Sequence, residues 1–198
     1  MEIKTSKLKD QRYRKFYFTG IIVLIFFIVF FTAQFFKAEH LFGITSKISL
    51  LEMFAFNTSS PLKWYGLTAL SSFFLHYNFL HLSINSILLL ILGPQFLAQI
   101  KKTNFIILIL FIHLVSLAFC FVLASKKQIF LGSSSALLGL FSLWLLKTKK
   151  YFLFSITLFI LIYSLVSKET NHLEAKVHLF SYLLGVFLYS LKRKPDWI

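Results

Sequence analysis

Six long apolar stretches divide the chain, and short charged or polar links separate them. A helix that spans a bilayer needs about 20 predominantly apolar residues, and each stretch comes near that length. The first stretch exceeds the apolar core of a secretory signal peptide, about 7–15 residues, so we expect it to be retained. The pattern predicts six membrane-spanning helices, near residues 15–36, 71–98, 103–124, 129–146, 151–167 and 176–191.

The connection over residues 37–70 is longer and more mixed than the other links. It combines charged residues with an Asn-Thr-Ser-Ser-Pro run at 57–61 and a Trp64-Tyr65 pair. Such a segment is too polar to span a bilayer, and its amphipathic aromatic rings favour the boundary between lipid and water. We therefore predict a long interfacial loop on the outer side of the membrane.

Composition supports a membrane protein and excludes several other classes. The chain is 58% hydrophobic and 14% charged, with 26 Phe in 198 residues, whereas soluble domains are about 45–50% apolar and about 25% charged. This inventory excludes a soluble enzyme and a disordered tail. A single cysteine also excludes a disulfide framework and a multi-cysteine metal site.

The distribution of Lys and Arg over alternate links predicts the orientation. Fourteen lie on the side of the two termini and seven on the other side. Because cytoplasmic links carry the excess of basic residues, both termini are predicted to be cytoplasmic in a multi-pass protein of the inner (plasma) membrane. Basic residues against anionic lipid account for the net charge of +14, so we expect the bilayer and no nucleic acid as a partner. The predicted parts are a basic N-terminus over 1–15, a six-helix membrane domain over 16–193 and a cytoplasmic tail over 194–198.

Polar side chains inside the predicted spans are the candidates for function, because they are costly in hydrocarbon. No Asp or Glu lies within any of these spans, which argues against a proton- or cation-coupled transporter. The candidates are His76, His81, Asn85, His113, Ser133, Ser134, Ser135, His178 and Ser181.

Four of these residues are predicted to lie at a similar depth in the membrane. Counted from the basic cytoplasmic ends at ~1.5 Å per residue, Ser134 lies roughly 20 Å up and His178 roughly 21 Å up. Asn85 lies roughly 24 Å up, and His81 is one turn higher on the same helical face. All four fall in the outer half of a core ~30 Å thick, so we expect them to meet although they are far apart along the chain.

Two of the predicted helices carry a small-x-x-x-small pattern, which lets membrane helices approach closely. The patterns are Ser135-x-x-x-Gly139 and Ser181-x-x-x-Gly185. Packing through them would bring Ser134 and His178 within hydrogen-bonding distance, ~2.6–3.2 Å.

A serine beside a neutral imidazole has the chemistry of a nucleophile and its general base. Serine reacts poorly until a neighbouring base takes its proton, and an apolar setting disfavours the imidazolium cation. His81, Asn85 and the backbone N–H of Ser134 can then donate to the oxyanion of a tetrahedral intermediate. The sequence offers no acidic third partner, so we predict a Ser134–His178 dyad.

These residues resemble the rhomboid family of intramembrane serine proteases, of the bacterial six-helix type. Ser135 and Ser181 stand where the family commonly has glycine, and only Lys63-Trp64-Tyr65 loosely replaces the usual Trp-Arg of the outer loop. The matching stretches are Gly132-Ser133-Ser134-Ser135-x3-Gly139, similar to the family's G-x-S-G-x-x-x-G, then His76-x4-His81-x3-Asn85-x7-Gly93 and His178-x6-Gly185.

The resemblance implies an all-α six-helix membrane bundle and a serine endopeptidase. It implies Ser134 as nucleophile, His178 as base, and a single-span membrane protein as substrate, unwound near its outer end with a small residue before the cut. It implies no cofactor and no metal. The residues that would allow the helices to pack closely around the site are Gly132, Ser135, Gly139, Ser181 and Gly185.

Several other interpretations remain open at this point. The three serines at 133–135 are also favoured helix caps, and an intramembrane histidine often serves as an interhelical hydrogen-bond partner. We expect that structural role for His76 and His113. A catalytically inactive rhomboid-like protein that binds transmembrane helices is the main alternative. A haem or metal site built from histidines is a weaker alternative, since His76 and His81 diverge on a helix.

Overall fold

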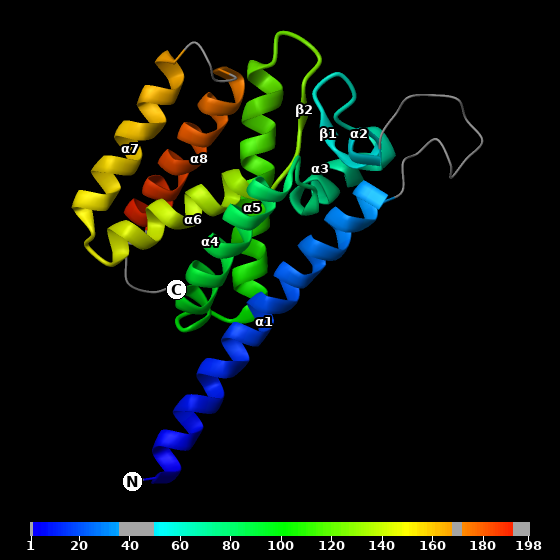
Figure 1. Cartoon of the computed structure of the whole chain (residues 1–198). Helices are drawn as coiled ribbons and strands as arrows, with labels where there is room; N and C mark the ends of the chain where they lie inside the picture. The colour runs from blue at the N-terminus through cyan, green and yellow to red at the C-terminus, as the bar shows by residue number, and fades with distance from the viewer. Residues whose placement is uncertain (1, 36–49, 168–171, 192–198) are drawn as a thin grey trace.

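The fold is a bundle of six long helices, as the hydropathy pattern predicts (Figure 1). The computed structural model describes residues 2–35, 50–167 and 172–191. Within these ranges the only strands are two of two residues each. The long helices are α1 (Glu2–Phe35), α4 (Phe79–Leu97), α5 (Lys102–Leu123), α6 (Ser134–Lys147), α7 (Tyr151–Val166) and α8 (His172–Leu191).

Three of these helices are long and apolar enough to cross a membrane. They are the part Tyr13–Gln34 of α1, α4 and α5. Helices α6 and α7 are apolar but shorter, with 14 and 16 residues. At ~1.5 Å per residue α6 is about 21 Å long, less than the ~30 Å of the hydrocarbon core. One end of α6 therefore falls inside the thickness of a bilayer.

The prediction of a helix from residue 71 was wrong at its start, because α4 begins only at Phe79. The turn η3 (Ser72–Phe74) and an extended Leu75 precede it. Asn78 is the N-cap, and its side-chain oxygen accepts the His81 N–H at 2.8 Å. Asparagine is among the preferred caps because it satisfies such an N–H. His76 consequently lies in the loop before the helix and not on the helix with His81.

The predicted helix from residue 129 was also wrong at its start. Strand β2 (Ile129–Phe130) pairs with β1 (Phe56–Asn57) in antiparallel register, with Phe56 opposite Phe130. Gly132 then adopts φ +105°, and its N–H donates to the Ser72 carbonyl oxygen at 2.7 Å. A positive φ is strained for other residues, so glycine ends the extended segment here. Helix α6 begins two residues later, at Ser134.

The described part of the predicted outer loop is folded. It contains α2 (Leu50–Phe54), β1, the 3-10 turn η2 (Lys63–Gly66) and α3 (Leu67–Ser71). Trp64 and Tyr65 are exposed, which suits aromatic rings at an interface. Residues 36–49 and the predicted tail 194–198 lie outside the described residues. The predicted N-terminal part is helical from Glu2, since α1 starts well before the apolar stretch.

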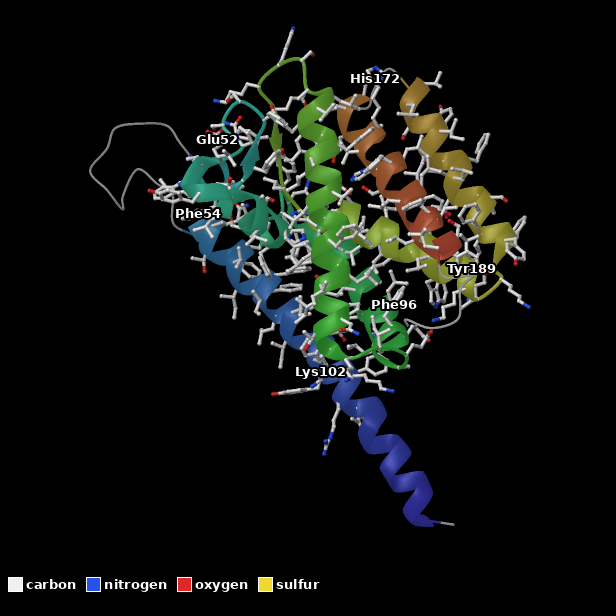
Figure 2. The ribbon with its side chains drawn as sticks, turned by 180° about the vertical axis from the view of Figure 1, so that it is seen from behind. Glu52, Phe54, Phe96, Lys102, His172 and Tyr189 are labelled. Carbon is white, nitrogen blue, oxygen red and sulfur yellow. The ribbon has the colours of Figure 1, made fainter. Side chains whose placement is uncertain are left out.

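The core lies where α1, α4, α5 and α6 face one another. Thr19 of α1 is fully buried and lies directly over Gly93 of α4, where a side chain would collide with it. Figure 2 shows side chains filling the space between the helices, with Lys102 and His172 at opposite ends of the bundle. The buried apolar residues of this core include Phe26, Phe73, Leu82, Leu89, Leu92, Phe105, Ile112, Leu137 and Leu140.

Candidate active site

Ser134 and His178, which 44 positions of the chain separate, form a hydrogen-bonded pair. The Ser134 hydroxyl oxygen lies 3.0 Å from His178 Nε2. Ser134 is the first residue of α6, and His178 lies in the second turn of α8. The distance is within the range expected between a nucleophile and its base. The structure thus contains the juxtaposition that depth and spacing predicted.

The three neighbouring serines have different surroundings, which distinguishes Ser134 from Ser133 and Ser135. Ser133 occupies the N-cap position of α6, yet its side chain makes no capping hydrogen bond. Its hydroxyl is fully buried and has no hydrogen-bond partner among the described residues. Ser135 is buried in the first turn of α6. Ser134 alone of the three has a hydrogen bond to an imidazole in the part of the chain described.

Close packing of α6 against α8 holds the pair together. At Gly185 a Cβ atom would collide with the Gly139 carbonyl oxygen and with the Ser142 hydroxyl. At Gly139 a Cβ would lie 2.9 Å from the Ser181 carbonyl oxygen. Both contacts involve backbone that cannot rotate away, so glycine is needed for this approach. The two small-x-x-x-small patterns therefore meet at the crossing of α6 and α8.

Buried hydroxyl groups reinforce the same crossing. Ser142 donates to the Tyr182 carbonyl oxygen at 2.7 Å, which links α6 to α8. The Ser181 and Ser116 hydroxyl oxygens lie 2.7 Å apart, which links α8 to α5. Ser181 also donates to the Val177 carbonyl oxygen, so its hydroxyl is satisfied within the membrane core. Serine at position 181 thus adds an interhelical hydrogen bond that glycine would not provide.

The side-chain amide of Asn85 is poised as a donor beside Ser134. Asn85 is 1% exposed, and its Nδ2 has no hydrogen-bond partner among the described residues. Asn85, His81, Ser134 and His178 line one cavity of about 380 Å³. The amide can therefore donate a hydrogen bond to an acceptor that enters the cavity. The four residues predicted to meet therefore share one cavity.

The imidazole of His81 packs against the backbone that precedes Ser134. A Cβ on Gly132 would lie 2.6 Å from His81 Cε1 and 2.9 Å from Nε2. The ring also stacks on Tyr77 with the centroids 6.4 Å apart. Gly132 thus serves two needs, a positive φ and room for the imidazole. This packing fixes His81 at the rim of the cavity.

At Ser134, the first residue of α6, the backbone N–H groups point out of the N-terminal end of the helix. A helix leaves its first N–H groups without intrahelical partners. The first intrahelical hydrogen bond of α6 runs from the Leu137 N–H to the Ser133 carbonyl oxygen, at 2.9 Å. The backbone N–H of Ser134 is therefore available as a donor next to its own hydroxyl.

Comparison with known protein families shows which family the chain belongs to. A family model for the rhomboid domain matches residues 63–194. The chain belongs to the rhomboid family. Comparison with curated proteins and with solved structures finds no match. The match covers every element of the site and all the long helices except α1, so this rhomboid protein is a multi-pass membrane protein in contact with lipid.

A second, much smaller cavity lies behind the Ser134–His178 pair of this rhomboid domain. It measures about 20 Å³ and is lined by His113, Ser135 and Glu174, as well as by the pair itself. This volume suffices for one water molecule. His113 Nδ1 is buried without a hydrogen-bond partner among the described residues, so a polar atom is available there.

Among the described residues His113 has hydrogen bonds to a distant segment, as expected of a structural histidine, whereas His76 has only a local one and its buried Nε2 has no partner. His113 Nε2 lies 3.2 Å from the Ser72 hydroxyl and 3.0 Å from the Ala69 carbonyl oxygen, and so links α5 to the short elements before α4. His76 Nδ1 lies 3.2 Å from the Phe74 carbonyl oxygen, and its ring packs on Phe26. In the described ranges no three His, Cys, Asp or Glu side chains are grouped as metal ligands would be.

Glu174 and Tyr77 also lie in the cavity that holds the pair, and the sequence had not predicted either of them there. Both line the cavity of about 380 Å³. Burial, and secondarily the Glu174 carboxylate, raises the pKa of Tyr77, whose hydroxyl donates to the Ile129 carbonyl oxygen. The i, i+4 spacing from His178 could have revealed Glu174, but the last helix was predicted to start only at residue 176.

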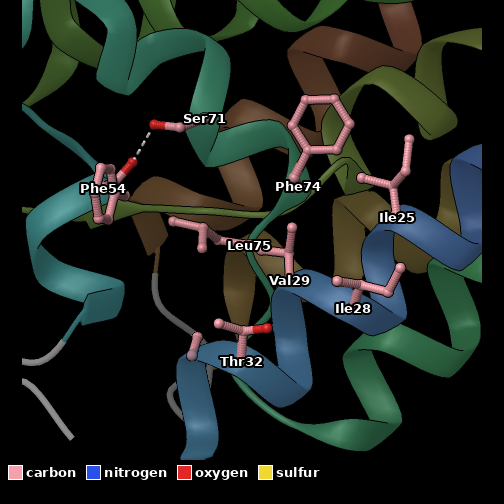
Figure 3. A pocket seen from close by; sticks show the side chains of 9 residues that line it. Ile25, Ile28, Val29, Thr32, Phe54, Ser71, Phe74 and Leu75 are labelled. Carbon is pink, nitrogen blue, oxygen red and sulfur yellow. Dashed lines mark hydrogen bonds between the residues drawn. The ribbon is translucent and has the colours of Figure 1, made fainter. Parts of the chain in front are cut away.

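Another groove of the rhomboid protein lies away from the Ser134–His178 pair and has few polar groups. It measures about 440 Å³ and lies between α1 and the short elements before α4 (Figure 3). Its polar lining residues are Thr32 and Ser71, and the Ser71 hydroxyl already donates to the Phe54 carbonyl oxygen at 2.6 Å. An apolar groove on a spanning helix suits hydrocarbon and lacks the groups needed for catalysis.

Proposed function

We propose that this rhomboid protein is a serine endopeptidase that cleaves single-span membrane proteins near the outer membrane face. The observation that carries the proposal is the 3.0 Å hydrogen bond between Ser134 Oγ and His178 Nε2 in a cavity shared with the unpaired amide of Asn85. Nucleophile, base and oxyanion donor are the three roles that acyl transfer requires. Rhomboid proteins are usually intramembrane serine proteases.

The first half of the reaction forms an acyl-enzyme. Ser134 Oγ attacks the carbonyl carbon of the scissile peptide, and its proton passes to His178 Nε2. The negative charge on the former carbonyl oxygen accepts hydrogen bonds from Asn85 Nδ2, His81 and the Ser134 N–H. The C–N bond then breaks, and His178 returns the proton to the leaving amine.

The second half hydrolyses that ester. A water molecule gives a proton to His178 and attacks the acyl carbon, and the bond to Ser134 Oγ breaks as the serine takes the proton back. The cavity of about 20 Å³ beside the pair has room for one such water. No cofactor or metal takes part in this scheme.

The substrate must be locally unwound to react. A helical segment in lipid keeps its carbonyl groups in internal hydrogen bonds, so they are closed to attack. Ser134 stands at the end of a helix only 14 residues long, which supports a site below the membrane surface that water reaches from the outer side. We propose accordingly that both termini are cytoplasmic, that the membrane is the inner (plasma) membrane, and that a small residue precedes the cut.

An inactive rhomboid-like protein that binds transmembrane helices is the second candidate. The feature that favours it is Ser135, which is buried directly after the nucleophile where the resemblance calls for glycine. A side chain there restricts the backbone that must donate to the oxyanion. This candidate predicts no turnover and no covalent labelling of a folded sample.

Cleavage of single-span model substrates by purified protein distinguishes the two candidates. We expect the wild type to cut such substrates and to be labelled by a fluorophosphonate probe. His178→Ala should lower cleavage by about 10³-fold or more, because Ser134 loses its base. His172→Ala, which removes an exposed histidine from the start of the same helix, is the matched control and should cut normally. Equal cleavage by the wild type and His178→Ala would contradict the mechanism.

Asn85→Ala tests the oxyanion site. We expect kcat to fall about 10²- to 10³-fold with little change in KM, because the lost donor acts on charge that develops only in the transition state. Ser86→Ala, at the adjacent buried position of α4 and outside the cavity lining, is the control and should retain wild-type kcat. A change in KM alone for Asn85→Ala would assign Asn85 to ground-state binding.

A further inference from the structure

Glu174 places a carboxylate beside the reactive pair. It lies in the first turn of α8, four residues before His178, and therefore on the same face of the helix. It is half-buried and lines both the cavity of about 380 Å³ and the one of about 20 Å³, together with Ser134 and His178. Its helix begins at His172, which lies at one end of the bundle (Figure 2).

The charge of Glu174 is not balanced within the cavities. Of the described residues that line them, none is Lys or Arg, and Glu174 is the single carboxylate. The titratable side chains that share these linings are Tyr77, His81, His113 and His178. Burial of a carboxylate without a cation costs free energy, so a positively charged ligand is the natural complement. The whole chain carries a net charge of +14, so an acidic side chain in the cavity lining contrasts with the basic character of the chain.

We propose that Glu174 is a specificity-determining residue that binds a Lys or Arg side chain of the substrate next to the scissile bond. The inference rests on the proposed protease function. A guanidinium or ammonium group meeting a half-buried carboxylate gains more than at an exposed surface, because the pair is less screened by water. Substrates with an acidic residue at the same place are repelled.

Geometry restricts the position of the substrate cation. Glu174 stands one helical turn from His178, about 6 Å along the axis of α8. An extended peptide rises ~3.3 Å per residue, so the cation belongs within about two residues of the bond that Ser134 attacks. Single-span proteins meet this condition when a basic residue flanks the membrane segment near its outer end.

Quenched fluorogenic peptides in detergent test the proposal. All peptides carry alanine directly before the expected cut. They differ only in having Lys, Gln or Glu at one of the other positions within two residues of the cut. We expect the wild type to prefer Lys over Glu by about three- to ten-fold in kcat/KM at one of these positions, mainly through KM. Glu174→Gln should abolish the preference, and Glu174→Lys should reverse it. Lys176→Gln, which alters an exposed charge two residues further along α8, is the control and should keep it.

The outcomes separate this inference from the function on which it rests. Equal cleavage of all three peptides by the wild type, or an unchanged Lys preference in Glu174→Gln, overturns the inference alone. A uniform loss of kcat for all peptides in Glu174→Gln also overturns it, because it assigns Glu174 to positioning His178. If the wild type cuts none of the peptides, including the uncharged Gln series, the protease function fails and the inference fails with it.

Discussion

Replacement of Ser134 by alanine is expected to abolish both proteolysis and covalent labelling. The hydroxyl that lies 3.0 Å from His178 Nε2 is the nucleophile that attacks the scissile peptide in the proposed mechanism. Removing such a group from a serine hydrolase costs about 10⁴-fold or more in rate, and no adduct can form without the oxygen. The measurement is turnover of a single-span substrate together with fluorophosphonate labelling of the purified protein.

Ser133→Ala is the matched control for this experiment. The Ser133 hydroxyl is one residue away, is buried and makes no capping hydrogen bond. The variant should therefore retain labelling and most of the cleavage rate. Loss of labelling in Ser133→Ala with retention in Ser134→Ala would show that the nucleophile had been assigned to the wrong serine.

Gly185→Val is expected to produce the largest loss of stability. A Cβ at this position collides with the Gly139 carbonyl oxygen and the Ser142 hydroxyl, so α6 and α8 must separate. Overpacking of a tight interface costs about 3 kcal/mol, which for a chain of this size lowers Tm by about 6–12 °C. The same separation moves Ser134 away from His178, so the labelling rate of the fraction that remains folded should also fall.

Gly20→Val is the control for the loss of stability. Gly20 also lies in a long helix, but a Cβ there would find nothing within 4 Å. Its Tm should remain within about 2 °C of the wild type, because an open position requires no displacement. A similar Tm for Gly185→Val and the wild type would contradict the close approach of α6 and α8.

The sequence predicted the elements whose cause is local. Runs of apolar residues identified the long helices, because hydrocarbon admits little else. The boundary of α5 came within a residue, since Lys101 and Lys102 end the apolar run sharply. Depth counted along helices placed Ser134 and His178 at one level, and the small residues at 139 and 185 explained how their helices could approach.

Features that depend on distant contacts were not predictable in this way. The apolar run that contains Ile129 and Phe130 has the composition of a helix, yet these residues pair with a strand more than 70 positions earlier in the chain. Likewise the run before Phe79 is apolar enough to be helical, but the Asn78 cap and the buried His76 loop interrupt it. Glu174 was not predicted because the charged segment up to Lys176 was interpreted as a link between helices. The last helix, α8, in fact starts at His172.

The short pairing between β1 and β2 makes the turn before Ser134 part of the outer segment. Gly132 is bonded to Ser72, and Phe130 is held opposite Phe56, while His81 of α4 packs against the same turn. His178 belongs instead to α8, on the far side of that turn. The position of Ser134 therefore depends both on the outer segment that holds this turn and on the packing of α6 against α8.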